Sequence, residues 1–329
     1  MAKSVRMADI AQRLGISIVS VSKGLSGKEG VSEEMRAKIL ETAREMGYEM
    51  QSRTDAPSAP GQTIGILVAD HFFNENAFYS ALYRALLNCC TAVGCSCMLE
   101  LVSSEAEKNC VMPTFLANRK VDAIVFMGEI SRRYISRAAA SGLPFLLLDF
   151  YDETLSAESV LSDNMAGGYT MTEHLLSSGR KKIGFAGSIN ATSSIMDRYL
   201  GYCKALLRHG IEPRTDWRLE DRDKEGRFIP FSLPDEMPEA FVCNCDEVAF
   251  NLVERLKREG YRVPQDVAVT GYDDYRFSTI CTPQLTSYRV DVEGMAAAAI
   301  DHLRRQMNHK RVSAPTVLVP GAFVKRDST

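Results

Sequence analysis

The chain has 329 residues, of which 45% are hydrophobic and 25% charged, and its net charge is −3. A chain of this length and composition is typical of a soluble globular protein with two or three domains. The sequence has no run of about 18 apolar residues, which a transmembrane helix needs, and its first 15 residues lack the apolar segment of a signal peptide. We therefore expect a cytoplasmic protein whose nine cysteines are mostly reduced.

The charge is unevenly distributed along the chain. Residues 1–28 carry a net charge of +4, whereas residues 54–329 carry −5. A small basic segment ahead of an acidic body fits a nucleic-acid-binding head attached to a body that does not contact phosphates. A solvated basic face would give the same pattern, so the charge alone is weak support.

Residues 7–46 have the spacing of three short helices. The first presents an apolar stripe at positions i, i+3, i+4 and i+7, formed by Met7, Ile10, Ala11 and Leu14. Gly15 supplies a turn, and Ser17 is a favourable N-cap for a second helix over about 17–25. Ser32 caps a third helix, and Gly47 follows it as a C-terminal glycine. The apolar stripe of the third helix is formed by Met35, Ile39, Ala43 and Met46.

Residues 49–62, EMQSRTDAPSAPGQ, have two prolines and little apolar content, which predicts a linker. Beyond it, near-continuous apolar strands alternate with helices, which indicates an α/β fold with parallel sheets covered on both faces. The predicted strands span 63–70, 95–102, 121–128, 144–150, 182–188, 240–244, 267–273 and 317–326. The predicted helices span 76–93, 106–118, 131–141, 165–178, 196–209, 246–259 and 291–307. Two such lobes joined by several crossings would enclose a cleft.

The first two helices are spaced as a helix-turn-helix, in which the second helix enters the major groove of DNA. Residues 7–48 carry D-I-A in the first helix, G-I-S at the turn, V-S-K in the second helix and V-S-E-E-M-R at the third. This segment resembles the N-terminal domain of LacI/GalR repressors. Further similar segments are SDNMAGGY (162–169), HLLSSGRKKIGFAG (174–187), SSIMDRYLGY (193–202), VPQDVAVTGYDD (263–274), PQLTSY (283–288) and VKRDST (324–329).

The resemblance implies an all-α helix-turn-helix head at 1–48, a hinge at 49–62 and an effector-binding domain at 63–329. That domain would have two Rossmann-like lobes of the type I periplasmic-binding-protein-like fold. The N-lobe would hold about 63–160 and part of 291–316, and the C-lobe 161–290 and part of 317–329. The implied function is a sequence-specific DNA-binding repressor controlled by a sugar or sugar derivative bound between the lobes.

The resemblance also implies the residues that contact operator DNA. Ile18, Val19 and Lys23 are the expected base-edge readers, with Lys23 donating to guanine and the other two making apolar contact. The alternative for Ile18 and Val19 is packing within the head. The expected phosphate contacts are Ser17, Ser20, Ser22 and Ser32, each of which could instead be a cap or a solvated hydroxyl.

The hinge departs from the family pattern. The family leucine that wedges into the minor groove falls on Pro57 here, although Arg53 lies close by as a candidate DNA contact. We therefore do not expect an intercalating hinge side chain.

For the effector, matching positions imply polar contacts from Asp149, Arg198, Asp246 and Asp273. Charged groups of this kind can pair with hydroxyls of a buried polyhydroxylated ligand. Loop aromatics could stack on the sugar, and the candidates are Phe72, Phe73, Phe78 and Trp217, with Phe72 and Phe78 favoured. Asp246 and Asp273 could instead cap helices, and the phenylalanines could be core residues.

Two departures make this pocket less polar than a typical sugar site. Cys245 stands where the family commonly has asparagine, and a thiol is a poor hydrogen-bond donor. Val290 occupies a position that often carries a polar residue. The identity of the ligand therefore stays open.

Other chemistry has little support in the sequence. The C-x-C pairs Cys95/Cys97 and Cys243/Cys245 lie in apolar strands without a second C-x-x-C pair or nearby histidines, so we interpret them as small buried hydrophobes and expect no metal. No phosphate-binding loop, nucleophile elbow or zinc-protease motif is present, so we expect no cofactor and no enzyme activity.

The expected partners are double-stranded operator DNA, a small-molecule effector and a second copy of the chain. A homodimer follows because paired helix-turn-helix units read a pseudo-palindrome. The chain ends without a leucine heptad, so we do not expect a coiled-coil tetramer. The alternatives are a transporter-type solute-binding protein, which would not carry residues 7–46, and a metabolite-binding enzyme with a DNA-binding head.

Overall fold

The structure is a computed structural model that describes residues 7–18, 20–21, 23, 31–46, 62–75, 77–223, 226–308 and 316–329. The chain divides into two compact units, Met1–Gly61 and Gln62–Thr329. Apart from Gln62, the predicted linker 49–62 lies outside the described residues. None of the helices among the described residues is long and apolar enough to span a membrane.

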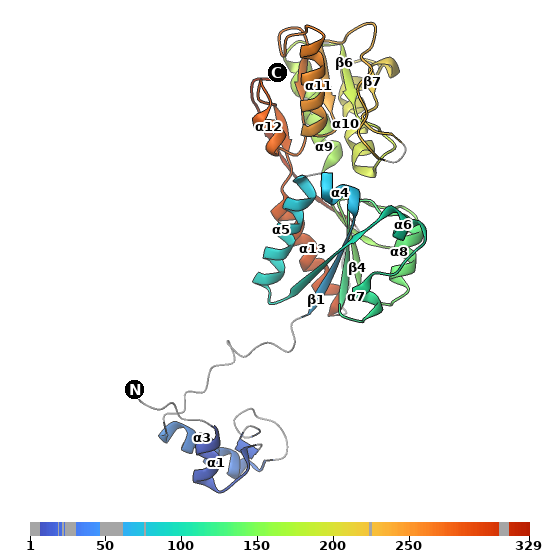
Figure 1. Cartoon of the computed structure of the whole chain (residues 1–329). Helices are drawn as coiled ribbons and strands as arrows, with labels where there is room; N and C mark the ends of the chain where they lie inside the picture. Colours follow the sequence, from blue (N-terminus) through green and yellow to red (C-terminus); the bar gives the residue numbers. More distant parts are fainter. Residues whose placement is uncertain are drawn as a thin grey trace. The chain divides into compact units, whose positions relative to one another are not determined.

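The first unit contains the predicted helices of the head. Helix α1 spans Met7–Leu14 and α3 spans Glu33–Glu45, and residues 18, 20, 21 and 23 between them are helical (Figure 1). The turn after α1 uses Gly15 at φ +65°, a conformation that glycine adopts without strain. The core of the unit is formed by Ile10, Ala11, Val21, Ile39 and Ala43. The predicted apolar stripes therefore do face one another.

The second unit begins with the N-lobe, which is built on a six-stranded sheet in the order β11-β5-β4-β3-β1-β2. All of its strand pairs are parallel, with Ile64 of β1 aligned with Cys97 of β2 and Ala123 of β3. The strands span β1 Thr63–Ala69, β2 Ser96–Val102, β3 Ala123–Met127, β4 Phe145–Leu148, β5 Glu158–Ser162 and β11 Thr316–Val319.

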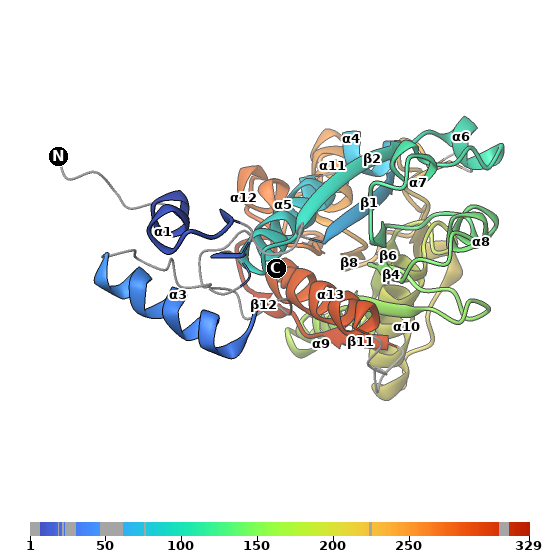
Figure 2. The ribbon, with the colours of Figure 1, turned by 90° about the horizontal axis from the view of Figure 1, so that it is seen from below.

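Helices cover both faces of this sheet. Helices α5 (Ala77–Ala92) and α13 (Val292–Met307) lie beside each other on one face (Figures 1 and 2). The short helices α6 (Ser104–Lys108) and α7 (Thr114–Ala117) and helix α8 (Arg132–Ala139) lie on the other side. This double cover explains why the strands are apolar along their whole length.

The C-lobe has a four-stranded parallel sheet in the order β7-β6-β8-β9. Its strands span β6 Ile183–Ala186, β7 Arg218–Leu219, β8 Ala240–Cys243 and β9 Ala268–Thr270. Its helices are α9 (Asn164–Ser177), α10 (Ser193–Arg208), α11 (Asp246–Arg258) and the short α12 (Arg276–Ile280). Asp163 caps α9, because its carboxylate accepts a hydrogen bond from the Ala166 N–H at 3.0 Å.

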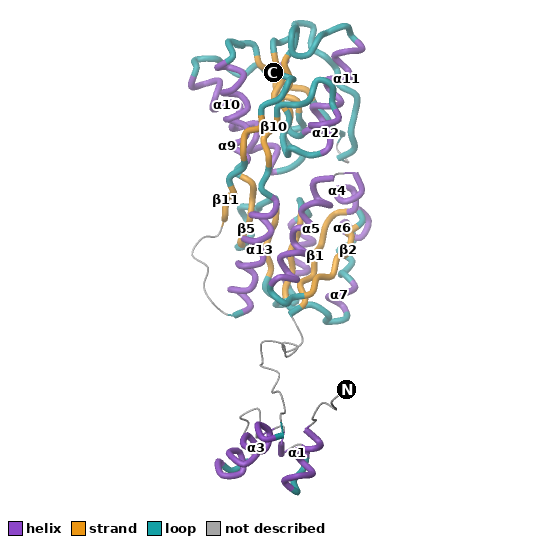
Figure 3. The backbone as a smooth tube through the Cα atoms, turned by 90° about the vertical axis from the view of Figure 1, so that its left-hand side faces the viewer, coloured by secondary structure: helices purple, strands orange, loops and turns teal. Residues whose placement is uncertain are grey.

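Three connections join the lobes, and Figure 3 shows them side by side. Strand β5 leads into α9, β10 (Ser287–Arg289) leads into α13, and β11 leads into β12 (Ala322–Val324), which pairs antiparallel with β10. Because β11 pairs with β5 in the N-lobe sheet, the last crossing follows Val319. This is a few residues later than the boundary at 316–317 that the sequence suggests.

Some predicted elements differ in detail. The helix predicted over 106–118 is two short helices, α6 and α7, separated by residues 109–113, where Cys110 adopts φ +51° and Pro113 precedes the second helix. A short helix α4 (Asp70–Glu75) follows β1 directly. Phe72 and Phe73, expected in a loop, therefore lie on this helix.

Candidate functional site

In the head, the hydroxyl groups of Ser17 and Ser32 act as helix caps. The Ser17 hydroxyl accepts a hydrogen bond from the Ser20 N–H at 3.0 Å and lies 2.9 Å from the Ser20 hydroxyl. The Ser32 hydroxyl accepts from the Met35 N–H at 3.3 Å. These bonds satisfy backbone donors that a helix start leaves unpaired.

The predicted base readers are partly described. Ile18 is 54% exposed, so its side chain does not belong to the head core, whereas Val21 is fully buried there. Lys23 is half-buried on the same stretch of helix. Val19, Ser22 and Arg53 lie outside the described residues.

In the second unit, two of the predicted acidic residues lie where strands end. Asp149 follows β4 and Asp273 follows β9, and the carboxyl ends of parallel strands are the usual location of ligand sites in open α/β sheets. Both residues adopt positive φ angles, +69° and +100°, which are uncommon for a residue with a side chain. Backbone bonds hold them there: the Asp149 N–H donates to the Val160 carbonyl and the Asp273 N–H to the Tyr288 carbonyl.

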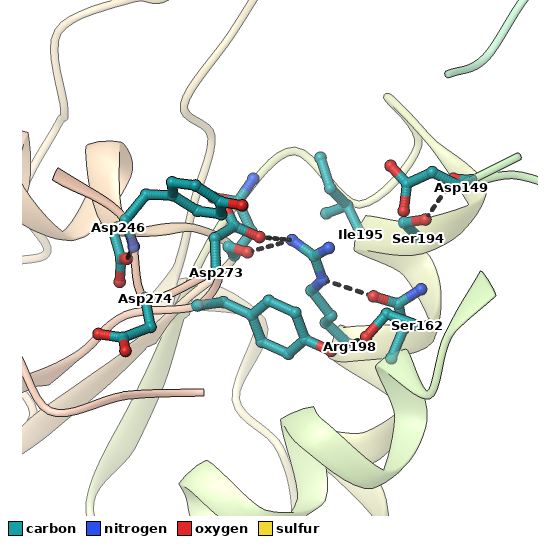
Figure 4. Close-up of polar contacts among 12 residues, drawn as sticks. Asp149, Ser162, Ser194, Ile195, Arg198, Asp246, Asp273 and Asp274 are labelled. Carbon is teal, nitrogen blue, oxygen red and sulfur yellow. Dashed lines mark hydrogen bonds and ion pairs between the residues drawn. The ribbon is translucent and has the colours of Figure 1, made fainter. Parts of the chain in front are cut away.

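Arg198 on α10 is the centre of a polar network of C-lobe residues at the cleft. Its side chain extends toward Asp273, as Figure 4 shows, and Nη1 lies 3.8 Å from an Asp273 oxygen. Nη1 also donates to the Asn244 carbonyl at 2.6 Å, and Nε donates to Asn164 Oδ1 at 2.8 Å. The guanidinium lies 3.8 Å from the centre of the Tyr272 ring. Arg198 is only 6% exposed, so these partners replace the water that its charge would otherwise bind.

Asp149 is held from both lobes. Tyr79 of α5 donates its hydroxyl hydrogen to Asp149 Oδ2 at 2.9 Å, and the Ser194 hydroxyl of α10 donates to the Asp149 carbonyl at 2.8 Å. The other carboxylate oxygen, Oδ1, is buried without a hydrogen-bond partner among the described residues. Asn244 Oδ1 is likewise buried without a hydrogen-bond partner among the described residues. Two buried acceptors are thus available to a donor in the cleft.

These groups line a narrow cavity of about 50 Å³ between the lobes. A volume of this size holds about one or two water molecules and is far below that of a typical ligand pocket. The lobes are therefore closed on each other in this structure. The lining residues are Phe72, Phe78, Tyr79, Asp149, Thr192, Ser194, Ile195, Arg198, Arg222, Asn244, Cys245 and Asp273.

Arg222 belongs to this lining and has a rigid setting. Its Nε and Nη2 donate to Asp221 Oδ2 at 3.0 and 2.8 Å, and its guanidinium lies 5.0 Å from the centre of the Phe228 ring. Asp221 in turn accepts from the Ser188 N–H at 2.6 Å and from Asn244 Nδ2 at 3.1 Å. The fixed guanidinium presents donors toward the cleft.

Five of the eight candidate effector residues meet in this cavity, and three do not. Phe73 lies outside its lining, and its ring packs edge-on against Tyr83 at 6.0 Å. Asp246 is also outside: its carboxylate accepts from the Tyr275 N–H at 2.8 Å and from the Ser287 hydroxyl at 2.6 Å. Trp217 is buried, and its indole N–H donates to the Glu236 carbonyl.

The two departures from the family pattern in the pocket, Cys245 and Val290, have different consequences. Cys245 does line the cavity, so the weaker donor expected from its thiol is present at the site. Val290 is 4% exposed within the main apolar cluster of this unit and is absent from the lining. The substitution at Val290 therefore affects packing in this closed form.

Sequence reasoning did not identify Tyr79, Arg222 or Asn244. Tyr79 directly follows Phe78 on α5, so its place beside a candidate aromatic residue could have suggested it. Arg222 lies in an irregular segment between β7 and β8, where no periodic pattern points to a function. Asn244 adjoins Cys245, and its contribution depends on bonds to Asp221 and Arg198 that only the folded chain brings together.

Burial shifts the titration of the carboxyl groups in the cleft. It raises the pKa of Asp273 to about 7 and that of Asp149 to about 6, although the Arg198 charge partly opposes both shifts. The pKa of Asp246 is also raised, mainly by burial. Over the described residues, no group of three or more His, Cys, Asp or Glu side chains could hold a metal ion.

These shifts predict a pH dependence of stability. Because the pKa values are higher than in the unfolded chain, the associated stabilisation is complete below about pH 4 and is lost as the pH rises through about 6 and 7. Between pH 5 and pH 8, the wild type should therefore lose on the order of 2 kcal/mol more unfolding free energy than the Asp273→Asn variant. Chemical denaturation at several pH values measures this.

The matched control is Asp301→Asn, which removes an exposed carboxylate on α13. It should leave the slope of stability against pH nearly unchanged. An equal slope in the wild type and the Asp273→Asn variant would contradict the assigned titration.

Comparison with known proteins shows which families the two parts of the chain match. Residues 6–51 match the model of bacterial regulatory proteins of the lacI family, and residues 172–329 match a periplasmic binding protein-like domain. Catabolite control protein A of Priestia megaterium is 26% identical over 99% of both chains. The solved complex of the transcriptional regulator CelR with cellobiose is 18% identical, with a TM-score of 0.71, and covers 99% of this chain and 100% of that one.

The lac repressor dimer bound to operator and the anti-inducer ONPF is 22% identical, with a TM-score of 0.69 and 99% coverage of both chains. The two solved structures support the fold, and the family models match both the head and the C-terminal half of the chain. The chain therefore combines a head that matches the lacI family of bacterial regulatory proteins with a periplasmic binding protein-like domain, and it is similar over its whole length to a relative named as a catabolite control protein.

Proposed function

We propose that this regulator represses transcription from a pseudo-palindromic operator and that a sugar or sugar derivative in the interlobe cleft sets its affinity for DNA. The observation that carries the effector proposal is the buried network of Arg198, Asp149 and Asp273. It combines the charge of Arg198 with a buried carboxylate oxygen, Asp149 Oδ1, that has room for another donor.

The polar groups of the cleft match the chemistry of a polyhydroxylated ligand. A hydroxyl group donates one hydrogen bond and accepts others, so it can serve Asp149 Oδ1 or Asn244 Oδ1 as a donor and an arginine as an acceptor. Phe72 and Phe78 add apolar surface to the same cavity, on which the C–H face of a sugar ring could stack. Asp246 and Phe73 are not part of this proposal, because they lie outside the cavity in the closed form.

The closed form also supports a mechanism. A cavity of about 50 Å³ cannot hold a sugar. Two hollows of about 380 Å³ each adjoin it, one sharing Phe72 and the other Arg222 with its lining. Effector binding therefore requires the lobes to open around it, and the ligand shifts the balance between lobe arrangements by its different affinity for each. That change would alter the spacing of paired heads and hence operator affinity.

For DNA recognition we propose Lys23, Ile18 and Val19 as base contacts and Ser17, Ser20, Ser22, Ser32 and Arg53 as backbone contacts. The exposure of Ile18 supports its availability to a base edge. The capping hydrogen bonds of Ser17 and Ser32 leave hydroxyl lone pairs and protons that can still reach a phosphate. The proposed assembly is a homodimer, since a two-fold operator pairs with a two-fold protein. The proposed location is the cytoplasm.

The effector proposal is tested by a thermal-shift screen of sugars, sugar acids and nucleosides with the full-length chain. A hit should raise the melting temperature, be recovered chemically unchanged, and alter binding to an operator selected from random duplexes. If no hit alters operator affinity, the effector proposal is wrong.

The DNA contacts are tested by Lys23→Ala. Loss of a base-edge donor should weaken binding to the selected operator by about 1–3 kcal/mol, equivalent to roughly tenfold to a hundredfold, and relax the preference at one base pair per half-site. Repeating the operator selection with the variant measures both effects.

Lys38→Ala is the matched control, since it removes an exposed lysine from α3 of the same head. It should leave the base preference unchanged. Should Lys23→Ala keep the full preference of the wild type, Lys23 is not a base reader.

A further inference from the structure

Hydrogen bonds from the N-lobe cross the cleft to the first residues of α10. Glu129 follows β3, and its Oε2 accepts from the Ser193 N–H at 2.8 Å. Tyr151 follows β4, and its hydroxyl donates to Asp197 Oδ1 at 3.1 Å. Strands β3 and β4 are parallel neighbours, so their carboxyl ends bring both side chains to one edge of the N-lobe sheet. The start of one C-lobe helix is therefore tied to that edge.

The bond to Glu129 uses an N–H that the helix itself leaves unpaired. The first N–H groups of an α-helix have no acceptor within the helix. The Thr192 hydroxyl accepts from the Ile195 N–H at 3.2 Å, whereas the Ser193 N–H is served by Glu129 from the other lobe. A carboxylate at this end of a helix also interacts favourably with the helix dipole. Separation of the lobes would remove both contributions.

These contacts lie beside the effector cavity. Glu129, Tyr151 and Asp197 are absent from its lining, and the first two line the adjoining hollow of about 380 Å³. Their bonds therefore favour closed lobes without the help of a ligand. A third link runs from the Ser194 hydroxyl to the Asp149 carbonyl and is drawn in Figure 4. Both of its residues line the cavity, so a substitution there would also alter the effector site.

We propose that Glu129, Tyr151 and Asp197 form a latch that holds the lobes closed in the absence of an effector. Because the closed cavity is too small for a sugar, an effector binds only molecules whose lobes have opened. Its apparent affinity then falls in proportion to the open fraction, which the latch sets. This regulation rests on the proposed effector function. Opening is measurable without an effector, so a failure of the latch is distinguishable from a failure of that function.

Cys245 is a native reporter of lobe opening. It lines the closed cavity and is 7% exposed, and a cavity that holds only one or two water molecules does not admit N-ethylmaleimide. The rate at which this reagent alkylates Cys245 therefore follows the open fraction. Cys281 is 2% exposed within an apolar cluster of the C-lobe, so its alkylation reports unfolding. Cys110 in the N-lobe is half-buried and reports the reactivity of the reagent.

The experiment treats the effector-free full-length chain with N-ethylmaleimide for increasing times and quantifies alkylation of each cysteine by peptide mass spectrometry. Tyr151→Phe removes one hydroxyl group, and Glu129→Ala removes the carboxylate. Each variant should raise the alkylation rate of Cys245 about fivefold, the effect of one lost hydrogen bond on the open fraction. The rates at Cys281 and Cys110 should equal those of the wild type.

Tyr261→Phe and Glu212→Ala are the matched controls, because they make the same chemical changes in the C-lobe outside these contacts. They should leave the rate at Cys245 unchanged. The latch is refuted if Tyr151→Phe keeps the wild-type rate at Cys245, or if the rate at Cys281 rises equally, since the variant then unfolds instead of opening. Because Tyr151→Phe keeps the aromatic ring, it decides the question even where Glu129→Ala fails to fold.

Discussion

Replacing Arg198 with methionine is expected to abolish effector binding and to lower the free energy of unfolding by about 3–5 kcal/mol. The methionine side chain fills a similar volume but donates no hydrogen bonds. It would leave Asn164 Oδ1, the Asn244 carbonyl and Asp273 without their shared partner in a buried site. Calorimetry with an effector identified by thermal shift measures the first effect, and denaturant unfolding measures the second.

Two further variants separate these effects. Lys204→Met removes an exposed charge from the same helix and should change neither effector affinity nor stability by more than about 0.5 kcal/mol. Arg198→Lys keeps the charge but loses the planar fork, so it should recover part of the stability while still binding effector at least tenfold more weakly. Normal effector affinity in the Arg198→Met variant would rule out the proposed role of this arginine.

Replacing Gly168 with alanine is expected to destabilise the second unit by about 3 kcal/mol. Gly168 lies on α9 where that helix meets α10, and a Cβ atom there would be 2.1 Å from the Arg198 carbonyl oxygen. Gly201 on α10 makes the reciprocal approach, with its Cβ position 2.2 Å from the Met165 carbonyl oxygen. Because backbone atoms form the contact, the two helices must move apart to accept a methyl group.

The direction of the change in unfolding free energy distinguishes a close helix contact from ordinary helix propensity. In a helix without such a contact, glycine to alanine stabilises by about 1 kcal/mol, because alanine has the higher helix propensity. Denaturant unfolding of Gly168→Ala and Gly201→Ala should both show destabilisation, and the displaced Arg198 backbone should also weaken effector binding. Stabilisation by either substitution would show that the helices do not meet this closely. Leu207→Ala, on the exposed face of α10, is the control and should have little effect.

The head was predictable because its signals are local. An N-cap serine, a turn glycine and an apolar stripe each depend on residues within about four positions, and Ser17, Gly15 and Ile39 take the expected roles. The alternation of apolar strands and helices likewise predicted two parallel sheets. The predicted helix over 106–118 is interrupted at residues 109–113, where Cys110 takes a positive φ angle and Pro113 precedes the next helix.

The cleft was predictable only in part. Arg198 and Asp273 lie in segments that resemble the family, Asp149 was inferred from a matching position, and all three line the cavity. Asp246 was also inferred from a matching position, but its carboxylate accepts from the Tyr275 N–H, just before α12, and from the Ser287 hydroxyl of β10. Local sequence does not encode that direction, since the competing donors come from distant segments.

Short-range spacing and residue type were enough to predict the resemblance to LacI/GalR repressors, the helical head, the alternating lobes and the charged residues at the ends of strands. Which side chains line the cleft became clear from the folded chain, which adds Tyr79, Arg222 and Asn244 and leaves Asp246 and Phe73 outside. The physical reason is that burial and hydrogen-bond partners are properties of segments brought together from both lobes. The same folding sets the raised pKa values of Asp149 and Asp273, which neither residue would show in an unfolded chain.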